Sequence, residues 1–293
     1  MKTSKLTRLF STAAVLAAAT VPAAAQEEAD TGVFGVEGLG ASVSLDVVSQ
    51  YIFRGYELED EGLIFQPGAS LSLGLTDTED FTVGAYVGAW QSLHSTPTGA
   101  GGDSPGSWFE SDLYAGVTLE AGYFSFDLGY IGYFYPSDAF SEIHEIVLTV
   151  GFDDSEFLGD WAFSPYIMYA QEIENDNGDE NAYLEIGGEL GFDLQEEFDL
   201  PFSVALPVVA GFSIDTYYLD ATGSEEFFGF LSVGAIGTIS MSELVGTEDF
   251  VGAWDLYGGV TLFLLNAEAA GLKDGTDNDS FNVVGSIGLS REW

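Results

Sequence analysis

SVSLDVVSQYIFR, residues 42–54, alternates between apolar and polar side chains. Val43 and Leu45 fall on one side of an extended chain, and Ser44 and Asp46 fall on the other. Because successive side chains of a β-strand point to opposite faces of a sheet, this pattern predicts a strand with one apolar face and one polar face. The strand would contribute a carboxylate to its polar face.

The same alternation, continued to the end of the stretch, assigns Tyr51 and Phe53 to the apolar face and Gln50 and Arg54 to the polar face. Similar patterns recur along the chain in about twelve segments, most of them long enough for a tilted strand to cross a bilayer. These segments are 42–54, 65–75, 81–92, 109–120, 123–135, 145–152, 161–171, 183–192, 203–213, 227–240, 252–264 and 281–293. No helical pattern is evident after the first 25 residues.

A sheet of this kind can turn its apolar face inward, as in a soluble sandwich, or outward into lipid, as in a transmembrane barrel. The links between segments favour the barrel, because long links rich in Gly, Asn, Asp and Ser alternate with shorter ones such as 76–80 and 121–122. Outer-membrane barrels have long external loops and short periplasmic turns. Aromatic residues also cluster toward the segment ends, as interfacial girdles require, among them Phe81, Phe109 and Phe124. We therefore predict an all-β fold, a single antiparallel transmembrane β-barrel of about 12 strands.

The start of the chain has the features of an export signal: a basic beginning, an apolar stretch over 9–19, and Ala23-Ala24-Ala25. No later window reaches the roughly 18 apolar residues that a membrane-spanning helix needs, so membrane residence would require a barrel. The absence of cysteine excludes disulfides and thiolate metal sites. We expect a signal peptide over 1–25, an N-terminal periplasmic segment over 26–40 and the barrel over 41–293.

The composition is strongly acidic, with 48 Asp and Glu residues, 6 Lys and Arg residues and a formal net charge of -42. Such a chain repels phosphate backbones, which argues against nucleic-acid binding. Its 46% hydrophobic and 14% aromatic content argues against a disordered acidic chain. The acidity has two readings: adaptation to salty surroundings, or an electronegative pore.

Carboxylates within the strand segments share the polar face, which points into the lumen of a barrel. A barrel of about twelve strands has a narrow lumen, and carboxylates around it would favour cations. Arg54 is the one cation predicted to face inward, and we expect it to pair with Asp46 or another lumen acid. The predicted pore-lining residues are Asp46, Arg54, Glu110, Asp112, Asp127, Glu185, Glu189 and Asp255, with Tyr86, Trp90, Tyr114, Tyr133, Tyr183 and Tyr257 beside them.

Catalytic and metal-binding patterns are sparse. We expect the two histidines, His94 and His144, to be solvated residues of a loop or rim, and we expect neither enzyme activity nor a cofactor. The acidic loops 174–180 and 274–279 carry hard oxygen ligands that suit weak Ca²⁺ binding, although neither matches the spacing of a known calcium loop.

Several motifs resemble one family of exported bacterial proteins. They are SQYIFRG at 49–55 followed by QPG at 66–68, VGAW at 87–90, ESDLYAG at 110–116 and FDLGY at 126–130. With these motifs the chain resembles the TorF-type porin family, also called Gcw_chp, over its N-terminal half above all. The resemblance implies a bacterial outer-membrane barrel that acts as a porin.

These observations predict an outer-membrane channel for passive diffusion of small solutes, with a preference for cations and with membrane lipid as its surroundings. A homo-oligomer is compatible with the prediction. One alternative is a structural or adhesive barrel whose lumen is closed by its own side chains and whose acidic external loops bind Ca²⁺ or a partner. Others are a barrel enzyme that acts on lipid through His144, and a soluble exported β-sandwich.

Overall fold

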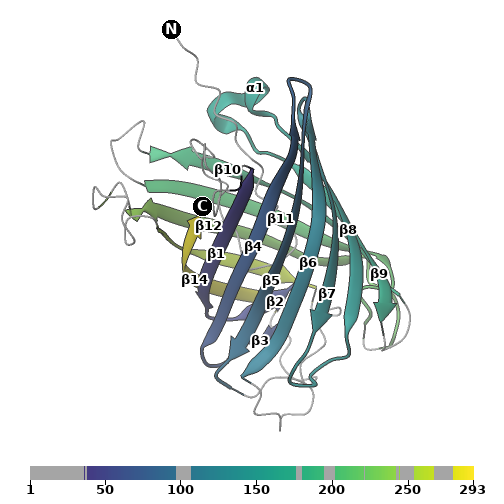
Figure 1. Cartoon of the computed structure of the whole chain (residues 1–293). Helices are drawn as coiled ribbons and strands as arrows, with labels where there is room; N and C mark the ends of the chain where they lie inside the picture. The colour runs from purple at the N-terminus through teal and green to yellow at the C-terminus, as the bar shows by residue number, and fades with distance from the viewer. Residues whose placement is uncertain are drawn as a thin grey trace.

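The computed structural model forms a closed antiparallel β-barrel of twelve strands (Figure 1). The structure describes residues 36, 38–96, 107–175, 180–194, 202–220, 222–241, 244, 254–266 and 280–293. The barrel strands are β1 (Leu39–Val48), β4 (Ile64–Asp77), β5 (Phe81–His94), β6 (Trp108–Ala121), β7 (Phe124–Phe134), β8 (Ile143–Phe152), β9 (Tyr166–Asn175), β10 (Ala182–Asp193), β11 (Phe202–Asp215), β12 (Phe228–Ser240), β13 (Asp255–Leu265) and β14 (Phe281–Glu292). The predicted fold class is confirmed, whereas the predicted signal peptide over 1–25 lies outside the described residues.

The barrel closes by pairing its first strand with its last, with Ser42 opposite Glu292 and Val48 opposite Ser286. Both ends of the barrel domain therefore lie at one end of the molecule, which we call the terminal end. The opposite end, where β1 leads toward β4, is called the loop end. No helix among the described residues is long and apolar enough to cross a membrane.

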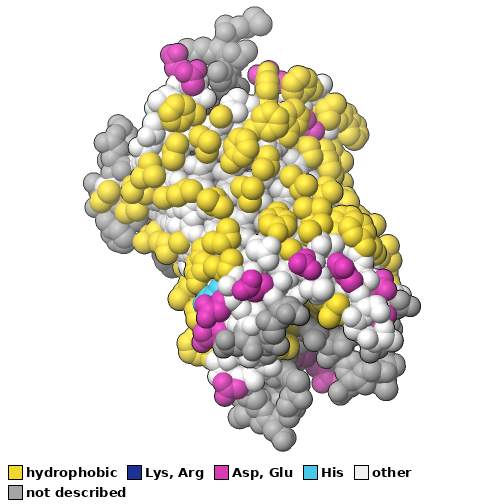
Figure 2. Space-filling model, turned by 90° about the vertical axis from the view of Figure 1, so that its right-hand side faces the viewer, with side chains coloured by type: hydrophobic (Ala, Val, Ile, Leu, Met, Phe, Trp, Pro, Cys, Tyr) yellow, Lys and Arg dark blue, Asp and Glu magenta, His cyan; other side chains and the backbone are white. Residues whose placement is uncertain are grey.

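The apolar side chains of the strands point outward, which excludes the sandwich. Leu71, Val87, Leu113, Leu128 and Ile287 are each between 45% and 56% exposed, a range that a buried sandwich core would not show. Figure 2 shows such side chains covering much of one face of the barrel, with Asp and Glu side chains gathered toward the loop end. The apolar belt is the surface that a transmembrane barrel presents to lipid.

The links at the terminal end include tight turns at 78–80 and 122–123, where short links were predicted at 76–80 and 121–122. The link between β8 and β9 is longer and contains a short helix, α1 (Ser155–Leu158), and a 3₁₀ turn, η2 (Gly159–Trp161). These two elements depart from the prediction of no helix. Helical periodicity cannot reveal an element of a single turn, because it repeats no apolar position.

The stretch after β1 folds into the barrel as a small hairpin, β2 (Tyr51–Phe53) and β3 (Tyr56–Glu59). Its turn residues, Arg54 and Gly55, both have positive φ, 47° and 84°, as a type I′ hairpin turn requires. The prediction of one continuous strand over 42–54, with Tyr51 and Phe53 on the lipid face, is wrong. Tyr51 is only 2% exposed and lies inside the barrel.

Ser49 ends the first strand. Its backbone N–H donates to Gly285 O at 2.9 Å, and its Oγ accepts the Gly285 N–H at 2.9 Å. A serine side chain that takes a partner of the sheet ladder in this way competes with continuation of the strand. The chain is then free to turn inward.

The core of the protein occupies the loop-end half of the barrel interior. The hairpin brings Tyr51 and Ile52 into two clusters of buried side chains that include Trp90, Phe109 and Ile131. Phe109 is fully buried, so its predicted place in a lipid-facing aromatic girdle is wrong. Phe81 and Phe124, in contrast, are exposed at the terminal ends of β5 and β7, as predicted.

The terminal-end half of the interior is less filled. Inward-facing residues there, including Tyr86, Gly116 and Glu189, are only half-buried, and Ser72 is exposed. Solvent therefore reaches the inner wall from the terminal end and meets the filled half further in.

Candidate functional site

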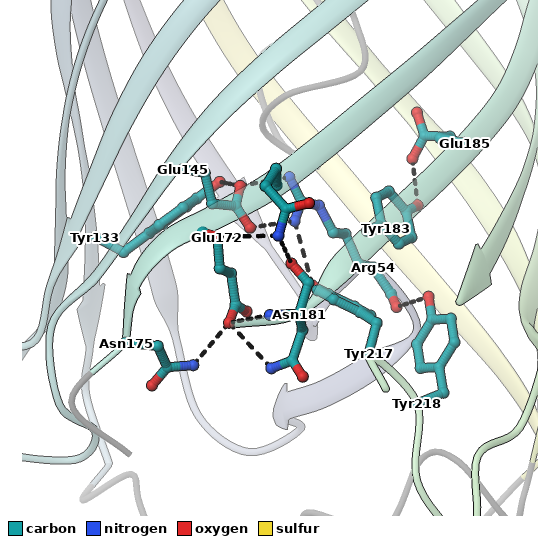
Figure 3. A network of polar contacts seen from close by, with 11 residues as sticks. Arg54, Tyr133, Glu145, Glu172, Asn175, Asn181, Tyr183, Glu185, Tyr217 and Tyr218 are labelled. Carbon is teal, nitrogen blue, oxygen red and sulfur yellow. Dashed lines mark hydrogen bonds and ion pairs between the residues drawn. The ribbon is translucent and has the colours of Figure 1, made fainter. Parts of the chain in front are cut away.

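An ion pair joins the inward-folded hairpin to the barrel wall (Figure 3). The Arg54 guanidinium donates to both carboxylate oxygens of Glu145 on β8, at 2.7 and 2.9 Å, and each side chain is 3% exposed. Tyr133 donates its hydroxyl to Glu145 at 3.0 Å, and the Tyr217 hydroxyl lies 3.3 Å from Arg54 Nη1. We call Arg54, Glu145, Tyr133 and Tyr217 the hairpin latch. Bidentate geometry of this kind is the strongest arrangement that an arginine and a carboxylate form.

Aromatic rings surround the guanidinium. Its Cζ lies 4.5 Å from the centroid of Tyr183, 4.9 Å from that of Phe53 and 5.7 Å from that of Tyr217. Burial disfavours a charged guanidinium, but the Glu145 carboxylate and the surrounding rings compensate for the lost water. Arg54 therefore remains a cation inside the barrel.

The hairpin backbone is held as well. The Tyr218 hydroxyl, from the link between β11 and β12, donates to Arg54 O at 2.6 Å. On the other side of the hairpin, Tyr51 donates to Glu110 Oε2 at 2.8 Å. The hairpin is thus attached to β6, to β8 and to a loop-end link, and it lies in the loop-end half of the lumen.

All predicted carboxylates of the wall lie on its inner face. Asp46 accepts the Tyr257 hydroxyl, Asp127 accepts that of Tyr86 at 2.9 Å, and Glu185 accepts those of Tyr166 at 2.7 Å and Tyr183 at 2.6 Å. Five of the predicted carboxylates are at most 5% exposed, and two are half-buried. The five are Asp46, Glu110, Asp112, Asp127 and Glu185; the two are Glu189 and Asp255. Their role in lining a pore stays a prediction.

Glu110 and Asp112 have fewer hydrogen-bond donors than they have acceptor atoms. Both are fully buried on β6, and neither oxygen of Asp112 nor Oε1 of Glu110 has a hydrogen-bond partner. They stand two residues apart on one strand, which places both on the same face about 7 Å apart along the chain. Among the wall residues that the structure describes, this is where acceptor atoms are least satisfied.

Tyrosines lie flat on the inner wall over cross-strand glycines. Tyr86 is the direct partner of Gly116, and a Cβ on this glycine would overlap the tyrosine ring. The same arrangement recurs for Tyr114 with Gly88, Tyr166 with Gly187 and Tyr257 with Gly288. Each ring covers a bare stretch of backbone, as in aromatic rescue of sheet glycines. For Tyr86, Tyr166 and Tyr257 the hydroxyl then donates to a carboxylate.

The predicted residues of the inner wall did not include two buried acids, Glu145 and Glu172. Glu145 and Glu172 share the inward parity of their strands, opposite Ile146 and Ile173, and this signal was available in the sequence. Glu172 accepts hydrogen bonds from Asn175 Nδ2 at 2.7 Å and from Asn181 N and Nδ2 at 3.1 and 3.0 Å. The prediction that Arg54 pairs with a lumen acid is met by Glu145 and not by Asp46.

The histidines have different surroundings from each other. His94 is 2% exposed and stacks on Phe109 at 4.6 Å between ring centroids, so the prediction of a solvated residue is wrong for it. His144 points outward near the loop end, and its Nδ1 lies 2.6 Å from the Tyr130 hydroxyl. Within the described part of the chain no three acidic or imidazole groups are placed to hold a metal ion. The acidic loop 274–279 and most of 174–180 lie outside that part.

A family model described as a bacterial protein of unknown function, Gcw_chp, matches residues 35–243. No curated protein sequence matches the chain. Among solved structures, the COG4313 outer membrane channel from Pseudomonas putida F1 is similar, with a TM-score of 0.51 and 12% identity over 91% of this chain and 99% of that chain. The NanC porin gives a TM-score of 0.43 and 12% identity over 84% and 98%, and the KdgM porin 0.41 and 8% over 85% and 98%. The likeness to the COG4313 channel shows a shared barrel fold.

Proposed function

The chain belongs to the Gcw_chp family, and we propose that it is a porin-like channel of the bacterial outer membrane that conducts small solutes by passive diffusion, with a preference for cations. The observation that carries the proposal is a polar, partly solvent-accessible inner wall that leads from the terminal end to a single constriction. That constriction is the β2–β3 hairpin and its latch. No bond chemistry and no cofactor enter the proposed function.

The charge on the inner wall supports the preference for cations. Glu189 and Asp255 are half-buried, so water reaches them, and further acids stand deeper in the lumen. Arg54 is the one cation on the inner side among the described residues, and Glu145 already neutralises it. Carboxylates along a narrow water-filled path attract cations and repel anions.

The hairpin determines how much passes. A solute that enters from the terminal end reaches the layer of Tyr51, Ile52 and Arg54, all at most 4% exposed. Passage then requires either a path beside the hairpin or its displacement toward the loop end. A constriction that is held in place by an ion pair should give a small conductance. Conduction needs a path that solutes can both enter and leave.

The same hairpin favours a second candidate function, a structural or adhesive barrel with a closed lumen. In that case the latch is permanent and the ion pair serves stability. The two candidates differ in one measurable property, the conductance of the intact barrel.

The experiment is planar-bilayer recording of the intact barrel beside a variant in which residues 51–59 are replaced by a Gly/Ser linker of equal length. The channel predicts discrete steps for the intact protein and larger steps for the variant, with a reversal potential that favours cations. Steps in the variant alone would assign the closed lumen to the intact protein. Silence of both, while heat-modifiable gel mobility shows folded barrels, would refute the channel.

The cation preference has its own test. Glu189→Gln and Asp255→Asn together remove two water-accessible lumen charges and should shift the reversal potential toward zero. Glu156→Gln is the matched control, because Glu156 is exposed on α1 outside the lumen. An equal shift in the control, or no shift in the double variant, would contradict a role of the lumen acids.

A further inference from the structure

The link between β8 and β9 presents large apolar side chains to its surroundings at the terminal end. Phe157 is 63% exposed, Leu158 is 52% exposed and Trp161 is 68% exposed. Segments that lie in water are not expected to gather such side chains within five positions, and contiguous exposed apolar surface marks an interaction site. The three residues belong to α1 and η2, and we call them the apolar edge.

The link is held in place by its own backbone and acids. Asp154 is buried, and its Oδ1 accepts the N–H groups of Phe163 and Ser164 at 3.1 and 3.0 Å. The N–H groups of Phe157 and Leu158 donate to Asp154 O at 3.0 and 2.9 Å. The apolar edge is therefore displayed by a defined turn and does not result from a frayed one.

The apolar edge continues the lipid-facing belt. Phe157 stacks on Phe152 of β8 with centroids 5.9 Å apart and planes at 19°, and it lies 5.3 Å from Tyr123. Phe152 in turn lies 5.2 Å from Phe124, an exposed outward residue of β7. At the other side of the link, Trp161 meets Phe192 of β10 edge-on at 5.9 Å. A chain of ring contacts thus runs from the barrel wall to the link.

We propose that residues 155–161 form an interfacial anchor that inserts its apolar edge into the lipid leaflet at the terminal end of the barrel, at the boundary between headgroups and acyl chains. Tryptophan and phenylalanine prefer this depth, and aromatic side chains bury the largest area each. The anchor increases the apolar surface that the barrel buries in one leaflet between β8 and β10. The proposal depends on the transmembrane fold and does not depend on conduction.

The charge of the link selects the lipid class. Glu156 and Asp160 are exposed, and the stretch 153–165 contains no Lys or Arg. Anionic headgroups would be repelled, whereas zwitterionic phospholipid presents no net charge. The partner is therefore a zwitterionic leaflet, entered by the aromatic and leucine side chains while the acids remain in water.

Single-cysteine labelling tests the anchor cleanly, because the chain has no cysteine of its own. Leu158→Cys carries a polarity-sensitive fluorophore at the apolar edge, and Asp160→Cys carries it on the same link at an exposed acidic position. In zwitterionic liposomes the label at 158 should show blue-shifted emission and quenching by lipids brominated near the headgroup. The label at 160 should keep the emission seen in water.

A second measurement uses native tryptophan. The emission difference between the intact protein and Trp161→Phe reports Trp161, and brominated lipid should quench it while an aqueous quencher should not. Quenching of the label at 158 and of Trp161 by the aqueous quencher would overturn the proposal. Shielding from the aqueous quencher that disappears when the barrel is diluted in lipid would also overturn the proposal. That result would mean that a second copy of the chain covers the apolar edge. A requirement for anionic lipid would overturn the assigned lipid class.

Discussion

Removing the Glu145 charge should release the hairpin from the barrel interior. In Glu145→Gln the amide keeps the size of the side chain, but the buried Arg54 loses the carboxylate charge and one of its two hydrogen bonds of 2.7 and 2.9 Å, because the amide nitrogen cannot accept. Removing one partner of a buried ion pair costs about 3 to 5 kcal/mol, since the remaining charge is left without compensation. Contacts of the guanidinium with Tyr183 and Phe53 persist, which favours the lower end of that range.

About 3 kcal/mol corresponds to roughly a 100-fold increase in the population of hairpins displaced from the latch. Trypsin can measure that population. After residue 25 the sequence offers trypsin only Arg54, Lys273 and Arg291, so cleavage after Arg54 yields an N-terminal fragment that mass spectrometry identifies. When opening and closing are fast relative to cleavage, the cleavage rate follows the population of the open form.

Glu172→Gln is the matched control. Glu172 is another buried carboxylate of the loop-end half, but it is bound by Asn175 and Asn181 and does not contact Arg54. We expect cleavage after Arg54 to rise about 100-fold in Glu145→Gln and to stay near the wild-type rate in the control. Equal rates in wild type and Glu145→Gln would refute the role of the latch. Equal acceleration in both variants would show that any lost lumen charge loosens the barrel.

Three further predictions concern other contacts of the loop end. Gly229→Ala places a Cβ in the ring of Tyr218, so the ring must move and its hydrogen bond to the hairpin backbone is lost. Docking of the hairpin is then weakened by about 1.5 kcal/mol, and trypsin cleavage after Arg54 should rise roughly tenfold. Tyr51→Phe leaves buried Glu110 without its hydroxyl donor, and about 1 to 3 kcal/mol of lost hairpin docking should appear as faster amide exchange in the hairpin; unchanged exchange would contradict the contact. The pKa of Asp220 is lowered below 3.8 by the hydroxyl and backbone N–H groups that follow it in the chain. The hydrogen bonds of its carboxylate therefore stabilise the loop above pH 3.8, and this stabilisation is lost as the pH falls through the pKa of the folded state. Titration of its carboxyl carbon by NMR checks this, and an ordinary pKa would contradict it.

Much of the architecture was predictable because strands impose a period of two. In the sequence, Asp46, Asp127 and Glu185 alternate with apolar neighbours, so a closed sheet must place all three on the face opposite the apolar one. They lie on the inner face of the barrel, as predicted. The alternation of long and short links then indicated which strand ends lie at which end of the barrel. The pairs of Tyr86 with Gly116 and Tyr257 with Gly288 carried the same parity signal.

Errors arose where the chain leaves the sheet. Tyr51 and Phe53 kept the alternation of β1 in the sequence, but Ser49 ends that strand and the next residues form a hairpin with its own orientation. His94 and Phe109 stand at strand ends, where parity does not say whether a side chain meets solvent or a plug. Their stacking inside the barrel follows from the hairpin position, which local sequence does not encode.

The sequence by itself determined the strands, the parity of each side chain and the polar character of the inner wall, since all three depend on neighbours along one strand. Only the tertiary structure decided that residues 51–59 fold into the lumen and that Arg54 binds Glu145. These two residues are 91 positions apart and meet because the barrel wall brings β8 to face the hairpin. Alternation specifies the side on which a charge lies, whereas its partner is specified by closure of the whole sheet.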